Sequence, residues 1–338
     1  MAEPLLNHLR LSFQACGCNS RCFHCSVGNE ASRAQPMRLE DIRECISAME
    51  CANTRTPSLY DRLSVCWLSE PADQPELEQL IAFLVTKKLF EGTLATNGER
   101  LAAEPGSLRR LAGIGVHALQ VSLYGLGDDH DKLEGRRGAW SQKLSVITRA
   151  VAAGLTVCVP VFARHGRFGE MPAIIKAVDA AAGAAAVRYS ITVWMPIGRG
   201  LYNDALIPTE TDFDVLPPEV RSLPRLDLFK PEYAWLDLAL KGAMDSLLAA
   251  FMSAKQSLGA PDHVLSLDAE NKVGIQELIG DLYTRFQAHK RSSASGVVPD
   301  VPLNQLAGRV GQPHSTRMHT VLSMVRTWEN RARAGSVR

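Results

Sequence analysis

The sequence predicts an α/β fold in which six βα units form a partial (β/α)6 parallel barrel. Short apolar runs typical of strands alternate with amphipathic helical segments about every 30 residues between positions 9 and 195. Parallel strands need a crossover between them, usually a helix, so this alternation predicts parallel pairing. The loops of unusual composition follow the predicted strands, and in such a barrel these loops gather at one mouth.

The predicted strands are runs of apolar and β-branched residues with helical segments between them. They are residues 9–13, 63–68, 92–95, 118–123, 155–162 and 187–194. Helices are predicted between them because leucine and isoleucine recur three or four positions apart, as in Leu77, Leu80, Ile81 and Leu84. We therefore expect residues 1–200 to form the barrel core.

The region after residue 200 has a weaker pattern. A helical stretch at 235–252 favours a mostly helical cap, residues 201–338, that shapes a substrate pocket. Residues 264–267 and 272–275 flank a turn and predict a hairpin within it. No cysteine follows Cys158, so we expect no second metal cluster in this cap.

The charge balance excludes several classes of function. Lys and Arg number 37 against 36 Asp and Glu, which gives no basic field for a nucleic acid. The N-terminus lacks a secretory pattern, and the longest nearly apolar run, residues 151–163, is too short to cross a bilayer. We expect a soluble, cytoplasmic protein without a nucleic-acid or membrane partner.

The cysteines are concentrated near the N-terminus. Four of the eight lie within residues 16–25, where Cys18, Cys22 and Cys25 are spaced C-x3-C-x2-C after the first predicted strand. This distribution suits a metal in a reducing compartment better than a disulfide framework. Three thiolates in one loop point to an iron–sulfur cluster with one open iron, whereas a zinc site would need Cys16 as its fourth ligand.

The cysteine loop resembles the signature of the radical S-adenosylmethionine (radical SAM) enzymes. The resemblance implies that Cys18, Cys22 and Cys25 bind a 4Fe–4S cluster whose open iron chelates the amino and carboxylate groups of S-adenosyl-L-methionine. The resemblance also implies that His24, at the position where the family usually has an aromatic residue, would lie beside the cofactor.

Two loops after predicted strands extend the resemblance. Leu68-Ser69-Glu70-Pro71 takes the place of the family's Gly-Gly-Glu-Pro loop, which implies that Ser69 and Glu70 meet the cofactor and that the Glu70 carboxylate accepts its ammonium group. Thr96-Asn97-Gly98 follows the third strand, where Asn97 is expected to contact the ribose.

The later loops complete the expected cofactor site. Ser122 corresponds to a family serine at the end of the fourth strand and is expected to contact the cofactor carboxylate. The segment from His130 to Gly138 resembles a His-Asp-x-x-x-Gly stretch, in which Arg136, with Lys132 as second choice, would reach the same carboxylate. Met195 and Pro196 stand where the family places backbone groups beside the adenine.

The resemblance implies a reaction type, of the oxidoreductase or lyase kind, without fixing its outcome. An external electron, from a donor such as flavodoxin or ferredoxin, reduces the cluster, and cleavage of S-adenosylmethionine gives a 5′-deoxyadenosyl radical that abstracts hydrogen from the substrate. Catalytic residues stay unassigned. The weak candidates are Cys66 and Cys158, whose thiols could face the barrel interior and donate hydrogen to a product radical. His165 is a weak candidate for proton transfer, because it lies just past the fifth predicted strand.

Three readings of the function stay open. The first is modification of a peptide or a peptide-derived natural product, because the core resembles the branch that includes peptide maturases. The second is radical modification of a small molecule such as a sugar or nucleoside. The third is a non-catalytic zinc or iron–sulfur binding module, in which Cys16 would complete the metal site.

Overall fold

The computed structural model describes most of the first 240 residues and short pieces beyond them. The described residues are 4–13, 18–25, 37–56, 58–67, 69–104, 106–183, 185, 187–193, 204–221, 229–240, 263–267, 277, 279–280, 284, 318–319 and 324.

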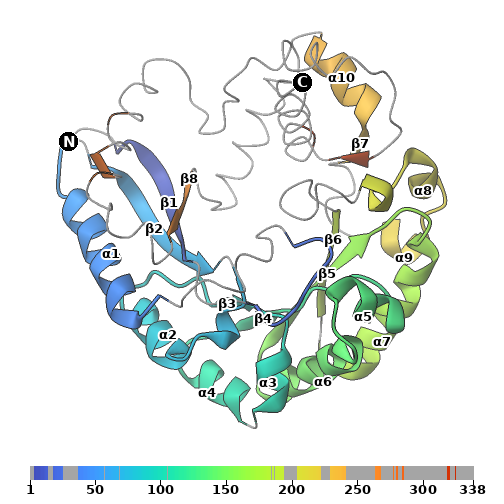
Figure 1. Cartoon of the computed structure of the whole chain (residues 1–338), viewed down its shortest axis with the longest axis horizontal. Helices are drawn as coiled ribbons and strands as arrows, with labels where there is room; N and C mark the ends of the chain where they lie inside the picture. Colours follow the sequence, from blue (N-terminus) through green and yellow to red (C-terminus); the bar gives the residue numbers. More distant parts are fainter. Residues whose placement is uncertain are drawn as a thin grey trace.

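Parallel strands form the inner wall of the molecule (Figure 1). They are β1 Leu6–Phe13, β2 Tyr60–Trp67, β3 Thr93–Ala95, β4 Ala118–Gln120, β5 Thr156–Ala163 and β6 Val187–Val193. They pair in two sheets, in the orders β2-β1-β8, where β8 is His263–Leu267, and β3-β4-β5-β6. A parallel bridge from Val65 to Phe90 joins β2 to the segment before β3. The predicted partial parallel barrel is confirmed, with strand positions close to those expected.

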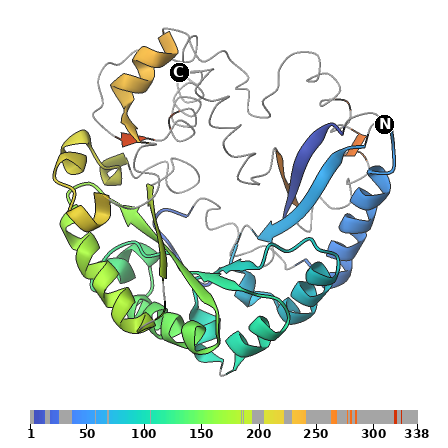
Figure 2. The same cartoon turned by 180° about the vertical axis from the view of Figure 1, so that it is seen from behind.

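Helices cover the outer face of this wall (Figure 2). They are α1 Leu39–Ala52, α2 Leu77–Thr86, α3 Glu99–Ala103, α4 Ser107–Gly113, α5 Asp128–Glu134, α6 Ala139–Ala152 and α7 Met171–Ala182, with short 3-10 turns at η2 Pro71–Asp73 and η3 Phe168–Glu170. In α1 the buried residues Ile42, Ile46 and Met49 lie three or four positions apart, so one face of the helix packs against the strands.

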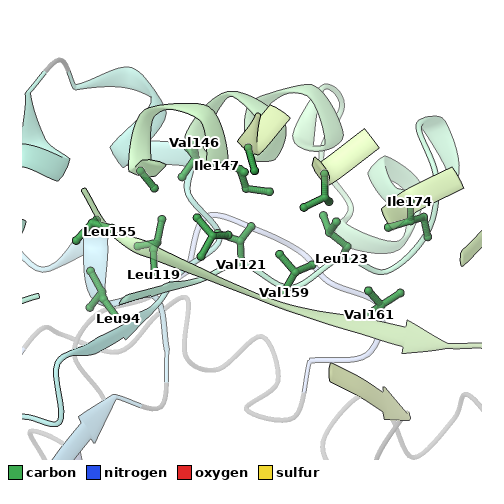
Figure 3. Packing of buried hydrophobic residues seen from close by; sticks show 14 of the residues in the cluster. Leu94, Leu119, Val121, Leu123, Val146, Ile147, Leu155, Val159, Val161 and Ile174 are labelled. Atoms are coloured by element: carbon green, nitrogen blue, oxygen red, sulfur yellow. The ribbon is translucent and has the colours of Figure 1, made fainter. Parts of the chain in front are cut away.

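The core lies between the strands and the helices (Figure 3). Val159 and Val161 of β5 are fully buried and pack in one cluster with Val146 and Ile147 of α6. Burial of each such side chain contributes about 1.5 to 3 kcal/mol. Because side chains alternate along a strand, this packing turns the intervening residues of β5, such as Cys158, toward the barrel interior.

The region after residue 200 also contributes to the barrel. Its described elements are η5 Asp204–Leu206, α8 Glu210–Asp214, α9 Pro218–Arg221, β7 Lys230–Pro231, α10 Glu232–Leu240, β8 His263–Leu267 and β9 Met318–His319. β8 pairs in parallel with β1, from Leu9 opposite His263 to Phe13 opposite Leu267.

This pairing differs from the hairpin predicted at 264–275. A strand does form over its first half, but its neighbour is β1, and residues 272–275 lie outside the described residues. The mostly helical cap stays a prediction. None of the helices in the described part of the chain is long and apolar enough to cross a membrane.

Candidate functional site

The three-cysteine loop is held by hydrogen bonds to the end of α5. The backbone N–H of Arg21 donates to the carbonyl of Glu134 (3.1 Å), and the N–H of Phe23 donates to the carbonyl of Leu133 (2.9 Å). The last carbonyls of a helix have no partner inside it, so the cysteine loop satisfies groups that α5 leaves open. The loop therefore has a fixed position relative to the barrel.

Gly135 permits this close approach. Its φ of +69° belongs to the left-handed region, which ends α5, and a Cβ atom at this position would lie 2.7 Å from the carbonyl oxygen of Arg21. Any other residue would face both the cost of this backbone conformation and a clash with the cysteine loop.

The thiols of Cys18, Cys22 and Cys25 are partly exposed at this loop. Burial raises the pKa of Cys22 to about 12, with a further contribution from Glu134 and a smaller opposing one from Lys143. Burial also raises the pKa of Cys18. Such thiols hold their protons until a metal displaces them on coordination.

The chemistry of this donor set fits an iron–sulfur cluster. Sulfur ligands from one loop suit iron–sulfur clusters, in which each cysteine binds a different iron. No three His, Cys, Asp or Glu side chains in the described part of the chain are arranged to hold a single metal ion. The described geometry thus gives no closed zinc site, and Cys16 lies outside the described residues.

A buried carboxylate beneath the loop collects four donors. Glu134, with 0% of its side chain exposed, contacts Lys143 Nζ at 2.6 Å and Arg136 Nη2 at 2.7 Å. It also accepts from His130 Nε2 (3.1 Å) and from Ser20 Oγ (3.2 Å) of the cysteine loop. Burial raises the pKa of Glu134, but the hydrogen bonds from His130 and Lys143 and the charge of Lys143 hold it well below its usual range.

The partners of Glu134 are themselves fixed. His130 Nδ1 accepts the backbone N–H of Tyr124 (3.1 Å), so the proton lies on Nε2 and is donated to Glu134. Lys143 Nζ donates to the carbonyl oxygen of Ser122 (2.9 Å) and lies 4.9 Å from the centre of the Tyr124 ring. This buried charged network joins the cysteine loop to α5, α6 and the chain after β4.

His24 packs as an aromatic residue between two others. Its ring centre lies 4.0 Å from that of Tyr124 and 5.5 Å from that of Phe162. Burial is the largest cause that lowers the pKa of His24, to about 3, and Lys143 adds to the effect. His24 is thus a neutral ring at physiological pH, in keeping with the aromatic position that the resemblance predicts.

Glu70 joins the ends of β2 and β3. Its carboxylate accepts the backbone N–H of Ala72 (3.0 Å), the hydroxyl of Thr96 (2.5 Å) and the backbone N–H of Asn97 (2.5 Å). Only 5% of Glu70 is exposed, and burial raises its pKa to about 7. Oε2 accepts one of these bonds and keeps one acceptor position, which the predicted cofactor ammonium would use.

Asn97 contacts the cysteine loop directly. Its Nδ2 lies 3.6 Å from Cys18 Sγ, 2.8 Å from Asn19 Oδ1 and 3.2 Å from Ser20 Oγ. The loop after β3 and the cysteine loop therefore form one surface, as expected for loops at the same end of parallel strands. The predicted contact of Asn97 with the ribose stays a prediction.

The remaining predicted cofactor residues contact other parts of the protein or lie outside the described residues. Ser69 lines a cavity at the end of β2. Ser122 offers its carbonyl oxygen to Lys143, and Arg136 is bound to Glu134 with its Nε 3.5 Å from Glu99 Oε2. Their contacts with a cofactor carboxylate stay predictions. Met195 and Pro196 lie outside the described residues.

The three weak catalytic candidates do not lie together. Cys66 lines the cavity inside the barrel and lies 3.4 Å from Ser12 Oγ, and Cys158 alternates with buried valines on β5. His165 lies elsewhere, with its Nδ1 2.7 Å from Asp212 Oδ2 and 53% of its side chain exposed. Asp212 also bonds the backbone N–H of Thr209 at the start of α8, so the His165 contact belongs to a helix cap.

Sequence reasoning missed several residues around the site. They are Thr96, Tyr124, Glu134 and Lys143. One signal was present, because Lys143 falls on the buried face of α6, four positions from Ala139 and from Ile147. A lysine on an apolar face needs a buried partner, and Glu134 sits one helical turn beyond His130.

Comparisons with known proteins agree with this geometry. Residues 15–167 match the model of the radical SAM superfamily. The AdoMet-dependent heme synthase of Methanosarcina barkeri is 28% identical over 57% of this chain and 52% of its own length. The GTP 3′,8-cyclase of Erythrobacter litoralis is 32% identical over 51% of this chain and 50% of its own.

The structure also resembles solved radical SAM proteins at low similarity. The structure of anSMEcpe with bound AdoMet and Cp18Cys peptide has a TM-score of 0.46 and 15% identity, over 72% of this chain and 66% of that one. The chain spans about half the length of the curated relatives that it matches. The family match therefore lies in residues 15–167, which carry the similarity to the radical SAM superfamily, whose enzymes use a 4Fe–4S cluster and S-adenosylmethionine.

Proposed function

We propose that this protein is a radical SAM enzyme in which Cys18, Cys22 and Cys25 hold the 4Fe–4S cluster. The observation that supports it most is the anchoring of the three-cysteine loop at the mouth of a parallel barrel, beside Asn97 and above the buried Glu134. When bound, the cluster and S-adenosylmethionine supply a 5′-deoxyadenosyl radical for hydrogen abstraction, after reduction by a donor such as flavodoxin or ferredoxin.

Three residues around the cysteine loop have separate roles in the proposed cluster and cofactor site. Glu134, through Ser20 and its own carbonyl, keeps the cysteine loop in place. Asn97 directs an N–H toward the sulfur of Cys18. Glu70 sets the path of the loop after β3 and offers one acceptor position for a cofactor ammonium group.

The proposed substrate is a peptide or a peptide-derived natural product. The interior cavity, about 310 Å³, is at the small end of ligand pockets, so a peptide would present one side chain to it. A second candidate is a small molecule taken up whole. The names of the curated relatives, a heme synthase and a GTP cyclase, favour this second candidate.

The test of the proposed function is cofactor cleavage without substrate. Protein purified and reconstituted anaerobically is given dithionite and S-adenosylmethionine, and 5′-deoxyadenosine is measured by chromatography. We expect it to accumulate with the wild-type protein and with Cys51→Ala, which removes an exposed cysteine of α1, and to be absent with Cys22→Ala. A protein that binds zinc only, or iron and sulfide without any affinity for S-adenosylmethionine, would contradict the proposal.

A further inference from the structure

The barrel interior carries a polar cluster on the first two strands. Leu9 and Leu11 of β1 are fully buried toward the helices, so His8, Arg10 and Ser12 point to the interior. The register places Arg10 opposite Ser64 of β2, and Arg10 Nε lies 3.4 Å from Ser64 Oγ. The face of β1 that points to the barrel interior, away from the hydrophobic core, therefore carries a charged side chain.

Two guanidinium groups in this cluster converge on one carboxylate. Arg10 Nη2 lies 2.9 Å from Glu91 Oε2, and Arg62 Nη2 lies 3.2 Å from Glu91 Oε1. His8 Nε2 is 4.0 Å from the same carboxylate and bonds Ser64 Oγ at 2.8 Å. The two arginines and one glutamate leave one unit of positive charge uncompensated within the cluster.

Arg10 has donors to spare. Its described hydrogen bonds use two of the five N–H groups that a guanidinium offers, and 25% of its side chain is exposed. A planar guanidinium binds an oxyanion through two parallel hydrogen bonds, so the free edge of Arg10 matches a carboxylate or a phosphate.

A cavity of about 310 Å³ begins at this cluster. Its walls come from the cluster, from the gap between β2 and β3, and from β4, and they include Arg10, Glu91, Cys66, Trp67, Ser69 and Gln120. The indole Nε1 of Trp67 is buried and has no hydrogen-bond partner among the described residues.

The cavity runs from the charged cluster toward the cysteine loop. Glu91 and Ala95 both line it, and they are four positions apart, which corresponds to at most about 13 Å of chain. Ser69, at the far end of the cavity, precedes Glu70 in the chain. The Glu70 carboxylate accepts the backbone N–H of Asn97, whose side-chain Nδ2 lies 3.6 Å from Cys18 Sγ. A ligand held at Arg10 therefore extends toward the place where the proposed radical forms.

We propose that Arg10, which lines the cavity, binds a carboxylate or phosphate group of the substrate there, while Arg62, outside the cavity, shares the Glu91 carboxylate. Glu91 holds the two arginines in position when no substrate is present. The uncompensated positive charge of the cluster then attracts the negatively charged group of the substrate. The inference rests on the proposed function, because it takes this cavity as the substrate pocket of the proposed radical SAM enzyme. It names the substrate class as an acidic side chain of a peptide or a small acid or phosphorylated molecule.

The test reads ligand binding through the reactivity of Cys66. The thiol of Cys66 lines the cavity, and Arg10 and Glu91 both act on it electrostatically. Reconstituted protein is treated with iodoacetamide at pH 8.5, and the alkylation rate of Cys66 is followed by peptide mass spectrometry. Inorganic phosphate and glutarate are the probes, with chloride at matched ionic strength as the reference and Cys51 as an exposed internal standard.

We expect one or both probes to slow alkylation of Cys66 at least threefold without changing that of Cys51. Protection by phosphate alone identifies a phosphorylated substrate, and protection by glutarate alone identifies a carboxylate. Arg10→Met should abolish the protection, while Arg109→Met, which removes an exposed arginine of α4, should keep it. Absence of protection by either probe, or equal protection in Arg10→Met, overturns the inference.

A second variant keeps the inference testable if Arg10→Met fails to fold. Glu91→Gln removes the competing carboxylate, so the probe concentration that gives half-protection should fall about tenfold. A purely structural ion pair predicts no gain of binding in Glu91→Gln. Because the readout is alkylation and not 5′-deoxyadenosine, failure of this inference and failure of the proposed function are separate results.

Discussion

Lys143 Nζ lies 2.6 Å from Glu134 Oε2, and neither side chain exposes more than 1% of its surface. Both charges are removed from water, so each depends on the other and on the added bonds from His130 and Arg136. The pair lies directly beneath the loop that carries the predicted cluster ligands, to which it is bound through Ser20. Fold stability and the geometry of the cysteine loop thus depend on the same two residues.

Glu134→Gln should therefore destabilise the protein strongly. The variant leaves the buried ammonium of Lys143 without its counter-charge, which costs about 3 to 5 kcal/mol. Urea unfolding of the metal-free protein measures this loss, and the iron bound after reconstitution should fall with it. Glu104→Gln, at an exposed carboxylate, should change the unfolding free energy by less than about 1 kcal/mol.

The coupling between the two residues is the stricter check. Glu134→Gln with Lys143→Met should lose less stability than the sum of the two single variants, because the second change removes the uncompensated charge that the first creates. Strictly additive losses would show that the two charges do not depend on each other.

Gly135→Ala should displace the cysteine loop. The added Cβ would lie 2.7 Å from the carbonyl oxygen of Arg21, and the φ of +69° adds about 1 to 2 kcal/mol of backbone cost. Gly154→Ala is the matched control, because Gly154 has a φ of +81° and a Cβ added there would meet none of the described residues within 4 Å. Both variants should lose stability, but only Gly135→Ala should bind less iron after reconstitution. Equal iron contents would rule out the proposed role of this contact.

The barrel was predictable from sequence because its strands and helices carry local signals. The alternation of buried and outward-facing residues on β5 and the spacing of Ile42, Ile46 and Met49 on α1 each lie within one element. The cysteine loop stood out in the sequence for the same reason, since Cys18, Cys22 and Cys25 are close in sequence, and their role as cluster ligands stays a prediction.

The remaining features depend on contacts between distant residues. β8 pairs with β1 across some 250 positions, and no local pattern distinguishes this pairing from a hairpin. The anchoring role of Glu70 depends on Thr96 and Asn97, which come from another βα unit. The cavity at Arg10 and Glu91 likewise requires the register of β1 and β2 and the bridge to the segment before β3.

Asn97→Ala should make the midpoint potential of the reconstituted cluster more negative. An N–H directed at a cluster sulfur stabilises the reduced state, and loss of a hydrogen bond worth about 1 kcal/mol corresponds to about 40 mV for one electron. Redox titration followed by electron paramagnetic resonance measures the shift. Ser20→Ala removes the bond of the loop to Glu134 but leaves Asn97 beside Cys18, so any shift that it causes measures loop displacement and should be smaller than that of Asn97→Ala. The same shift in both variants would assign the effect to loop disorder and not to this hydrogen bond.

Glu70 should make the folded protein lose stability as the pH rises. Burial raises its pKa in the folded state from 4.5 to about 7, so the folded state keeps a proton that the unfolded chain has already lost. The contribution is complete below pH 4.5 and disappears as the pH passes 7, a loss of about 3 kcal/mol. Urea unfolding of the metal-free protein at pH 5 and pH 8 measures it. Glu70→Gln cannot ionise at this position, so its stability should fall by about 2.5 kcal/mol less than that of the wild type between pH 5 and pH 8, because part of the loss precedes pH 5. Equal losses in the two proteins would mean that Glu70 is already ionised in the folded state at pH 5, held so by the N–H groups of Ala72 and Asn97.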